Sequence, residues 1–220
     1  MSLRAENKQR RRLRILDAAR AIVAKRGVDA LSMRMVARDA GLSVTTLYNL
    51  FGSKEEIRAA LCGDLLDGID REIAKVPLSR PIERAEAVIT VGAAHVASAG
   101  EVARTALLAS RAGAGHAGQD ISRPRSVEMQ RVAIQAAMDA GLLRAELAAG
   151  LVAAQVYEGF SVAALRWANR ELDATGFRDQ ALYSLYLCLL ALASDEIRPA
   201  LLRSIQSLES RMTRRAKRAA

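Results

Sequence analysis

The chain has 220 residues, of which 51% are apolar and 4% aromatic, and it carries a formal net charge of +9 at pH 7. This length suits one large domain or two small ones with a buried core, whereas the longest uncharged run, residues 181–194, is too short to span a membrane. Much of the apolar share is Ala, Leu and Val, and no run alternates as a strand does, so we expect an all-α protein.

The positive charge is concentrated at the two ends of the chain. Residues 1–60 carry 13 basic and 6 acidic side chains, residues 211–220 carry five basic and no acidic ones, and residues 61–210 have a net charge of −3. A basic footprint on part of a molecule indicates a polyanionic partner. Nucleic acid is the first candidate and an anionic membrane surface is the second.

Two cysteines, Cys62 and Cys188, stand among apolar neighbours and outside any Cys-x-x-Cys or Cys/His pattern. We expect them to be buried thiols in a reducing compartment. The N-terminus is basic but lacks the apolar segment of a signal peptide. The sequence therefore favours a cytoplasmic protein with no metal site and no cofactor.

Residues 1–9 are predicted to form a polar, basic arm, and the first helix is predicted to follow and to end at Gly27. Four arginines crowd the start of this helix: Arg10, Arg11, Arg12 and Arg14. Such a run is ordinarily a solvated surface. Beside the motif that follows, it is also suited to track the DNA backbone or to enter the minor groove.

Residues 32–54 predict a helix, a turn and a second helix. Ser32 and Ser43 can cap the two helices, and Gly41 suits the left-handed backbone of the turn. Leu47, with Leu50 and Phe51, is expected to face inward, which leaves small and hydrogen-bonding side chains outward. This arrangement suits a helix that enters the major groove of DNA.

The same stretch resembles the N-terminal domain of TetR-family transcriptional regulators. Their pattern has Thr-Leu-Tyr near the end of the recognition helix, then Phe, a turn, and a Lys that opens the next helix. The matching residues are Thr46, Leu47, Tyr48, Phe51, Ser53, Lys54 and Glu55. Leu50 stands where the family usually has a histidine. The resemblance covers about the first quarter of the chain and implies that Lys54 contacts the DNA backbone.

The predicted DNA-binding residues are Ser32, Arg34, Ser43, Val44, Thr45, Thr46, Tyr48, Asn49 and Lys54. Ser32, Tyr48 and Lys54 are expected to hold phosphates, and Arg34 to reach either a phosphate or a guanine edge. Thr45, together with Ser43 and Thr46, is expected to face bases. Val44 either packs beneath the helix or touches a thymine methyl group.

A long helix from Ser53 towards Pro77 is expected to link the helix-turn-helix to the rest of the chain, which we call the body. Movement of the body could then change the spacing between two DNA-binding domains. Two helices broken near Gly100 are predicted between residues 81 and 110, and another helix over 125–140. The glycine-rich segment 111–119, which contains His116, is predicted to be a mobile loop.

The last predicted pair of helices spans residues 147–170 and 177–197. The second is apolar on nearly every side from Ala181 to Ala193, and such a helix must be buried. We expect one short chain to cover only one face of each helix, so that a second copy completes a four-helix bundle. The TetR resemblance implies the same homodimer, which would present two recognition helices to a palindromic operator in double-stranded DNA.

The resemblance also implies a small-molecule effector, bound in the body, that releases the protein from DNA. The candidate effector-binding residues are His95, Arg104, Tyr157, Phe160 and Trp167. Core or dimer packing is the competing explanation for the aromatic residues. Their arrangement does not identify the effector.

The predicted parts are thus a basic arm (1–9), a helix-turn-helix domain (10–55), a helical effector-binding and dimerisation domain (56–207) and a basic tail (208–220). The leading interpretation is a homodimeric repressor, and an activator of the same fold is the alternative. An enzyme is disfavoured because the sequence has no phosphate-binding glycine loop, HExxH motif or Cys/His metal set. A membrane-surface scaffold that uses the basic ends is the third interpretation.

Overall fold

The computed structural model describes residues 3–111 and 122–219, and their regular elements are helical. They follow in the order α1 (Leu3–Arg26), the 3-10 helix η1 (Val28–Ala30), α2 (Met33–Asp39), α3 (Val44–Phe51), α4 (Lys54–Ile73), α5 (Pro81–Ser98), α6 (Gly100–Arg111), α7 (Arg123–Asp139), α8 (Ala149–Ala168), α9 (Ala174–Leu192) and α10 (Arg198–Ala219). These two segments contain no β-strand, which confirms the all-α prediction. Among the described helices, none is both long and apolar enough to cross a membrane.

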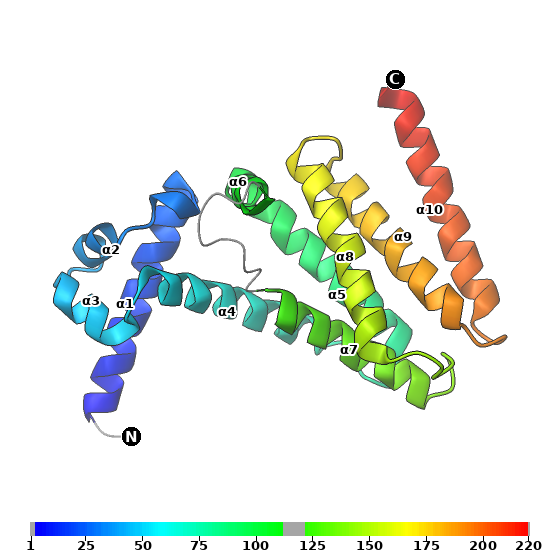
Figure 1. Cartoon of the computed structure of the whole chain (residues 1–220), viewed down its shortest axis with the longest axis horizontal. Helices are drawn as coiled ribbons and strands as arrows, with labels where there is room; N and C mark the ends of the chain where they lie inside the picture. Colours follow the sequence, from blue (N-terminus) through cyan, green and yellow to red (C-terminus); the bar gives the residue numbers. More distant parts are fainter. Residues whose placement is uncertain (1–2, 112–121, 220) are drawn as a thin grey trace.

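The helices form two packed groups joined by α4, with α1 to α3 at one end of the molecule and α5 to α10 at the other (Figure 1). The N-terminal group has its own core. Ile15, Val36, Leu47 and Phe51 are at most 2% exposed, and α4 adds the fully buried Ile57 from its first turns. Since each such side chain stabilises the fold by about 1.5–3 kcal/mol, this core fixes the orientation of α3.

Helix α4 also belongs to the body of the protein. Its later turns bury Leu66, Ile69 and Ile73 in a small cluster with Val88 of α5 and Met129 of α7. In addition, a guanidinium nitrogen of α7 lies 2.5 and 2.6 Å from two carboxylates on α4, in the Arg125–Asp67 and Arg125–Asp70 ion pairs. One rigid helix is therefore packed into both groups.

The body is built on the close approach of α8 and α9. A Cβ atom added at Gly159 of α8 would lie 2.5 Å from the Cβ of Ser184 on α9, so only glycine fits at this crossing. Small side chains continue the contact, since Ala163 and Ala181 are fully buried. The alanine-rich composition thus allows these two helices to pack closely.

The C-terminus differs from the sequence prediction. The predicted last helix ended near Ile197 and residues 208–220 were expected to be a basic tail, but α10 runs from Arg198 to Ala219. Its apolar residues Leu201, Ile205 and Leu208 are spaced by one turn and are buried against the body. The many basic residues on the other face obscure this amphipathic pattern in the sequence.

Helix α10 changes the argument for a second copy. Helix α9 packs against α5, α8 and α10 of the same chain. The expectation that one chain covers only one face of α9 is therefore wrong in part, because it left out α10, which covers a further face. Large apolar side chains nevertheless remain exposed nearby: Leu151 by 75% and Val162 by 57% on α8, and Leu187 by 45% on α9.

The N-terminus also differs from the prediction, because α1 begins at Leu3 and the described part of the expected arm is helical. The predicted end of this helix is confirmed, since α1 stops at Arg26 and Gly27 follows with a φ of 81°. The predicted loop at 111–119, with His116, lies outside the described residues except for Arg111, which ends α6.

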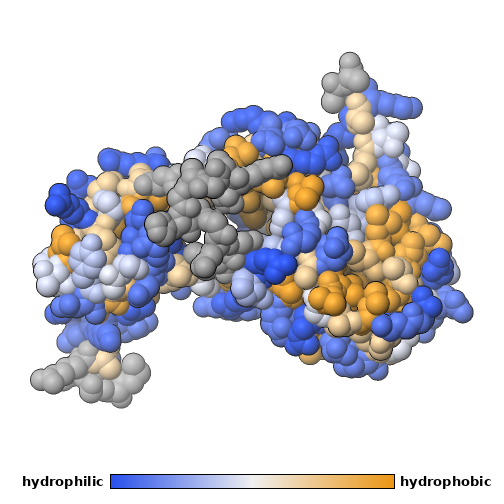
Figure 2. All heavy atoms as spheres, in the orientation of Figure 1, coloured by the Kyte–Doolittle hydropathy of each residue, from blue (hydrophilic) through white to orange (hydrophobic). Residues whose placement is uncertain are grey.

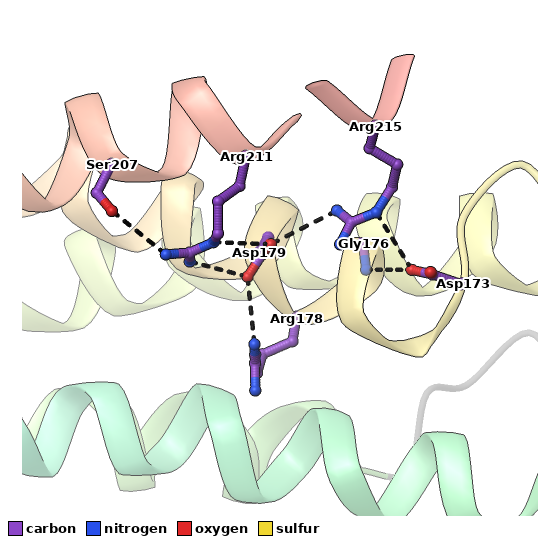
Figure 3. Close-up of polar contacts among 7 residues, drawn as sticks. All are labelled: Asp173, Gly176, Arg178, Asp179, Ser207, Arg211 and Arg215. Carbon is purple, nitrogen blue, oxygen red and sulfur yellow. Dashed lines mark hydrogen bonds and ion pairs between the residues drawn. The ribbon is translucent and has the colours of Figure 1, made fainter. Parts of the chain in front are cut away.

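A buried carboxylate fastens α10 to α9 (Figure 3). Asp179 of α9 is fully buried, and Arg211 of α10 donates two hydrogen bonds to it, at 3.0 and 3.2 Å. Arg215 and Arg178 each place a nitrogen 3.5 Å from the same carboxylate. Burial alone would raise the pKa of Asp179, but the hydrogen bonds from Arg211 and the charges of the three arginines together lower it below its ordinary value.

We expect the Asp179→Asn variant to lose about 2 kcal/mol of unfolding free energy at pH 7, because the charged hydrogen bonds to Arg211 are lost. The folded-state pKa of Asp179 is lowered, so its stabilisation is present above the unfolded-state value of about 4 and is lost as the pH falls through the folded-state value. Urea unfolding at pH 7 and pH 3 should therefore show a smaller difference between the variant and the native protein at pH 3. Asp195→Asn, at an exposed position before α10, is the matched control and should change little. An Asp179 effect that is the same at both pH values would contradict this account.

Candidate nucleic-acid interface

The turn between α2 and α3 is held by the residues that the sequence pattern singled out. Ser32 accepts a hydrogen bond from the backbone N–H of Met35 at 3.3 Å and so caps α2. Ser43 accepts one from the backbone N–H of Thr46 at 3.1 Å and caps α3. Between them Gly41 has a φ of 63°, and a Cβ there would lie 2.9 Å from the guanidinium of Arg14. The predicted helix starts and turn are confirmed.

Helix α3 has one buried face and one polar face. Leu47 and Phe51 are at most 2% exposed, and Leu50, in the place of the family's usual histidine, packs half-buried against the same core. Thr45 and Asn49 are exposed. Tyr48 is 51% exposed and Val44 is 37% exposed, so Val44 is not packed beneath the helix. The polar face of α3 is therefore exposed to solvent.

Two of the predicted base-facing hydroxyls are engaged with each other. The Oγ of Ser43 and the Oγ1 of Thr46 lie 2.8 Å apart, and Ser43 also caps the helix. Thr45, Tyr48 and Asn49 have no such intramolecular partner among the described residues. The exposed surface available to a ligand is therefore narrower than the sequence pattern indicated.

Two of the N-terminal arginines bind backbone carbonyls of their own domain. Arg12 donates to the backbone carbonyl of Leu50 at 2.5 Å, and its guanidinium lies 4.0 Å from the centre of the Phe51 ring. Arg14 donates to the backbone carbonyl of Ala40 at 2.6 Å. These side chains satisfy carbonyls at the C-terminal ends of α3 and α2. Both belong to the arginine run that the sequence favours as a DNA-facing surface.

The cations that remain available flank α3. Arg34 is exposed at the start of α2, and Lys54 is half-buried in the first turn of α4. Within the described segments neither of them has an ion-pair or hydrogen-bond partner. The Oγ of Ser53 accepts from the N–H of Glu56 at 3.1 Å, so other N–H groups of this first turn remain available near Lys54.

A second candidate site is a cavity of about 140 Å³ in the body, between α4, α5, α7 and α8. Of the five candidate effector-binding residues, Tyr157 and Phe160 line it. Gln130 of α7 also lines the cavity and is only 2% exposed. Gln130 is not among the residues predicted from the sequence, although a glutamine within the apolar stripe of a helix is a signal for such a position.

The other three candidates are placed away from the cavity. Arg104 lies over the Trp167 ring, 3.9 Å from its centre, and donates to the Trp167 carbonyl. Trp167 is 2% exposed and stacks on Phe177. His95 places Nδ1 3.0 Å from the carbonyl oxygen of Val91, one turn earlier in α5. These surroundings favour a packing role for the three residues over contact with an effector.

The geometry defines a helix-turn-helix domain of the DNA-binding class, joined by a long helix to a larger helical body. Among the residues that the structure describes, no group of three His, Cys, Asp or Glu side chains could hold a metal ion. Residues 15–61 match the family described as bacterial regulatory proteins, tetR family. This similarity covers the helix-turn-helix and the start of α4.

Comparison with individual proteins agrees. An 88-residue segment is 34% identical to the HTH-type transcriptional repressor KstR of Rhodococcus jostii, a match that covers 40% of this chain and only 42% of that protein. The fold is similar to a TetR transcription regulator from Haloarcula marismortui (TM-score 0.62, 16% identity, 84% of this chain and 100% of that one). It is also similar to the TetR-family repressor FadR of Thermus thermophilus in complex with lauroyl-CoA (TM-score 0.62, 18% identity, 83% and 95%).

We expect Arg12→Ala to lower the unfolding free energy of the N-terminal domain by about 1–2 kcal/mol, because a hydrogen bond and a cation–π contact are lost. As the domain is destabilised, hydrogen exchange of the α3 backbone amides should become faster. Arg12→Lys should recover only part of the loss, since an ammonium lacks the planar donor fork. The neighbouring exposed Arg11→Ala is the control and should leave stability unchanged. A variant of Arg12 that binds DNA poorly while retaining native stability would contradict a structural role.

Proposed function

We propose that the protein is a cytoplasmic, homodimeric repressor of transcription that binds a palindromic DNA operator and is released from it by a small molecule. The observation that carries the proposal is the exposed polar face of α3, held in place by the buried Leu47 and Phe51. The similarity to KstR, which is named a transcriptional repressor, supports it. So does the similarity in fold to FadR, a repressor crystallised with lauroyl-CoA.

The proposed DNA contacts divide into specific and general ones. Thr45 and Asn49 are neutral and exposed, which suits hydrogen bonds to base edges, and Val44 is placed to meet a thymine methyl group. Tyr48, Lys54 and Ser32 are assigned to phosphates, and Arg34 to a phosphate or a guanine edge. Ser43 and Thr46, which contact each other, are assigned a secondary part.

The proposed homodimer forms through α8 and α9. Leu151, Val162 and Leu187 leave apolar area exposed on these two helices. Figure 2 shows hydrophobic residues gathered over the lower ends of α8, α9 and α10. A second copy would cover this surface by twofold symmetry, and α10 would then lie beside the four-helix bundle.

Release from DNA is proposed to run through α4. Leu65, Leu66 and Ile69 of this helix line the cavity, whereas its first turns carry Lys54 and the buried Ile57. We therefore place the boundary between the DNA-binding and effector-binding parts inside α4. A molecule that enters the cavity displaces α4, which positions α3. The separation between the α3 helices of the two copies therefore changes.

Selection of bound duplexes from a random DNA pool tests the proposal. A palindromic consensus whose affinity falls steeply with salt is expected. Binding to all duplexes alike, with no protected palindrome in a footprint, would overturn it.

We expect Lys54→Ala and Thr45→Ala to weaken operator binding in different ways. Lys54→Ala should lower affinity evenly across sequences and reduce the salt slope by about one per bound protomer, because a phosphate contact is lost. Thr45→Ala should leave the slope unchanged and alter which base is preferred in each half-site. Binding measured by fluorescence anisotropy on a panel of single-base variants separates the two. Lys75→Ala, just beyond the far end of α4, is the control for the loss of one positive charge. The reverse pattern would mean that the two roles are exchanged.

We expect Leu151→Glu to dissociate the homodimer. Each copy would lose the burial of a leucine and gain a charge in the interface. Because the interface is twofold symmetric, the substitution acts at two positions in every dimer. The dimer dissociation constant, measured by analytical ultracentrifugation, should rise by about two orders of magnitude or more. Leu78→Glu, at a 49% exposed position between α4 and α5, should leave it unchanged. A monomeric native protein at micromolar concentration would overturn the dimer.

A further inference from the structure

The side chain of Gln130 is unusual within the body of the protein. It is 2% exposed, and within residues 3–111 and 122–219 neither its Nε2 nor its Oε1 has a hydrogen-bond partner. A buried amide in this state destabilises the folded chain, and nearly all buried polar groups are paired. Gln130 also belongs to the wall of the cavity between α4, α5, α7 and α8. An unpaired donor and acceptor therefore lie buried in the wall of a space that a ligand can fill.

The rest of the cavity restricts what can fill it. Apolar side chains such as Ile69 and Phe160 form most of the wall, Ser122, Ser126 and Tyr157 also line it, and no charged side chain is found among the described residues that do so. An ionised ligand would lose its hydration there without gaining a counterion. The volume of about 140 Å³ is close to that of an engineered cavity of roughly 150 Å³ that holds benzene. The cavity thus suits an uncharged molecule about one ring in size.

We propose that the effector is an uncharged, single-ring molecule with an adjacent hydrogen-bond donor and acceptor, and that Gln130 recognises this polar group. The inference rests on the proposed function, in which this cavity is the effector site. A lactam or carboxamide meets the requirement, because its N–H can donate to Oε1 while its carbonyl accepts from Nε2. Both amide atoms are shielded from a water-sized probe, so binding requires a turn about the Gln130 side-chain bonds that brings the amide to face the ring.

Such a site selects its ligand in a specific way. An apolar ring of the same size leaves the Gln130 amide unpaired, whereas a ring with the polar group pairs both of its atoms. An acyl-CoA is much larger than the cavity and carries phosphates, so lauroyl-CoA, the ligand of FadR, falls outside the class proposed here.

Calorimetric titration of the full-length protein with 2-pyridone and toluene tests the proposal, because the two rings have the same number of heavy atoms and only the first is a lactam. We expect 2-pyridone to bind the native protein. In Gln130→Leu the ratio of 2-pyridone affinity to toluene affinity should fall at least tenfold, while toluene binds as well as before or more tightly. Gln135→Leu is the control, since Gln135 is bonded to Asp139 and does not line the cavity, and it should leave the ratio unchanged.

Gln130→Leu should fold with unchanged or greater resistance to urea, because the unpaired amide is removed. The proposal is overturned if 2-pyridone does not bind the native protein, or if the affinity ratio is the same in Gln130→Leu. It is also overturned if lauroyl-CoA releases the selected operator and 2-pyridone does not. That last result would leave the proposed function intact, whereas failure to select any palindrome in the absence of probes would reject the proposed function itself.

Discussion

The packing of α4 into two separate cores is the constraint on which the molecule depends. Ile57 at one end of the helix is buried with α1 to α3, and Ile69 and Ile73 at the other are buried with α5 and α7. A helix held at both ends cannot shift at one without moving side chains at the other, because protein interiors are close-packed. The cavity lies beside the body end of this helix, which makes its contents mechanically relevant to α3.

Local signals in the sequence predicted the helix-turn-helix well. The caps at Ser32 and Ser43 and the turn at Gly41 depend on residues at most a few positions away, so the pattern alone was sufficient. The buried positions Leu47 and Phe51 followed from helical spacing in the same way. Which exposed residues touch DNA remains a prediction, since the geometry of α3 fixes only what is accessible.

Contacts between distant parts of the chain were not predictable in this way. Arg12 meets the carbonyl of Leu50, 38 residues away, and nothing near Arg12 in the sequence distinguishes it from the exposed Arg11. The sequence marks Gln130 as a glutamine in an apolar stripe, but its lack of a partner among the described residues is seen only where α4, α5 and α8 enclose it. Helix α10 was missed because five basic residues after position 210 outweighed the one-turn spacing of three apolar ones.

The placement of α10 separates the two basic regions of the chain. Figure 1 shows the C-terminus at the opposite end of the molecule from α1 to α3, and Arg211 and Arg215 are partly neutralised by the buried Asp179. The positive charges of residues 211–217 thus lie at the far end of the molecule from α3, and solvent ions screen exposed charges beyond about 10 Å, so these charges add little to DNA binding by α3. The electrostatic attraction that orients an approaching polyanion therefore comes from the end that carries α1 to α3. The basic surface at the far end acts separately from it.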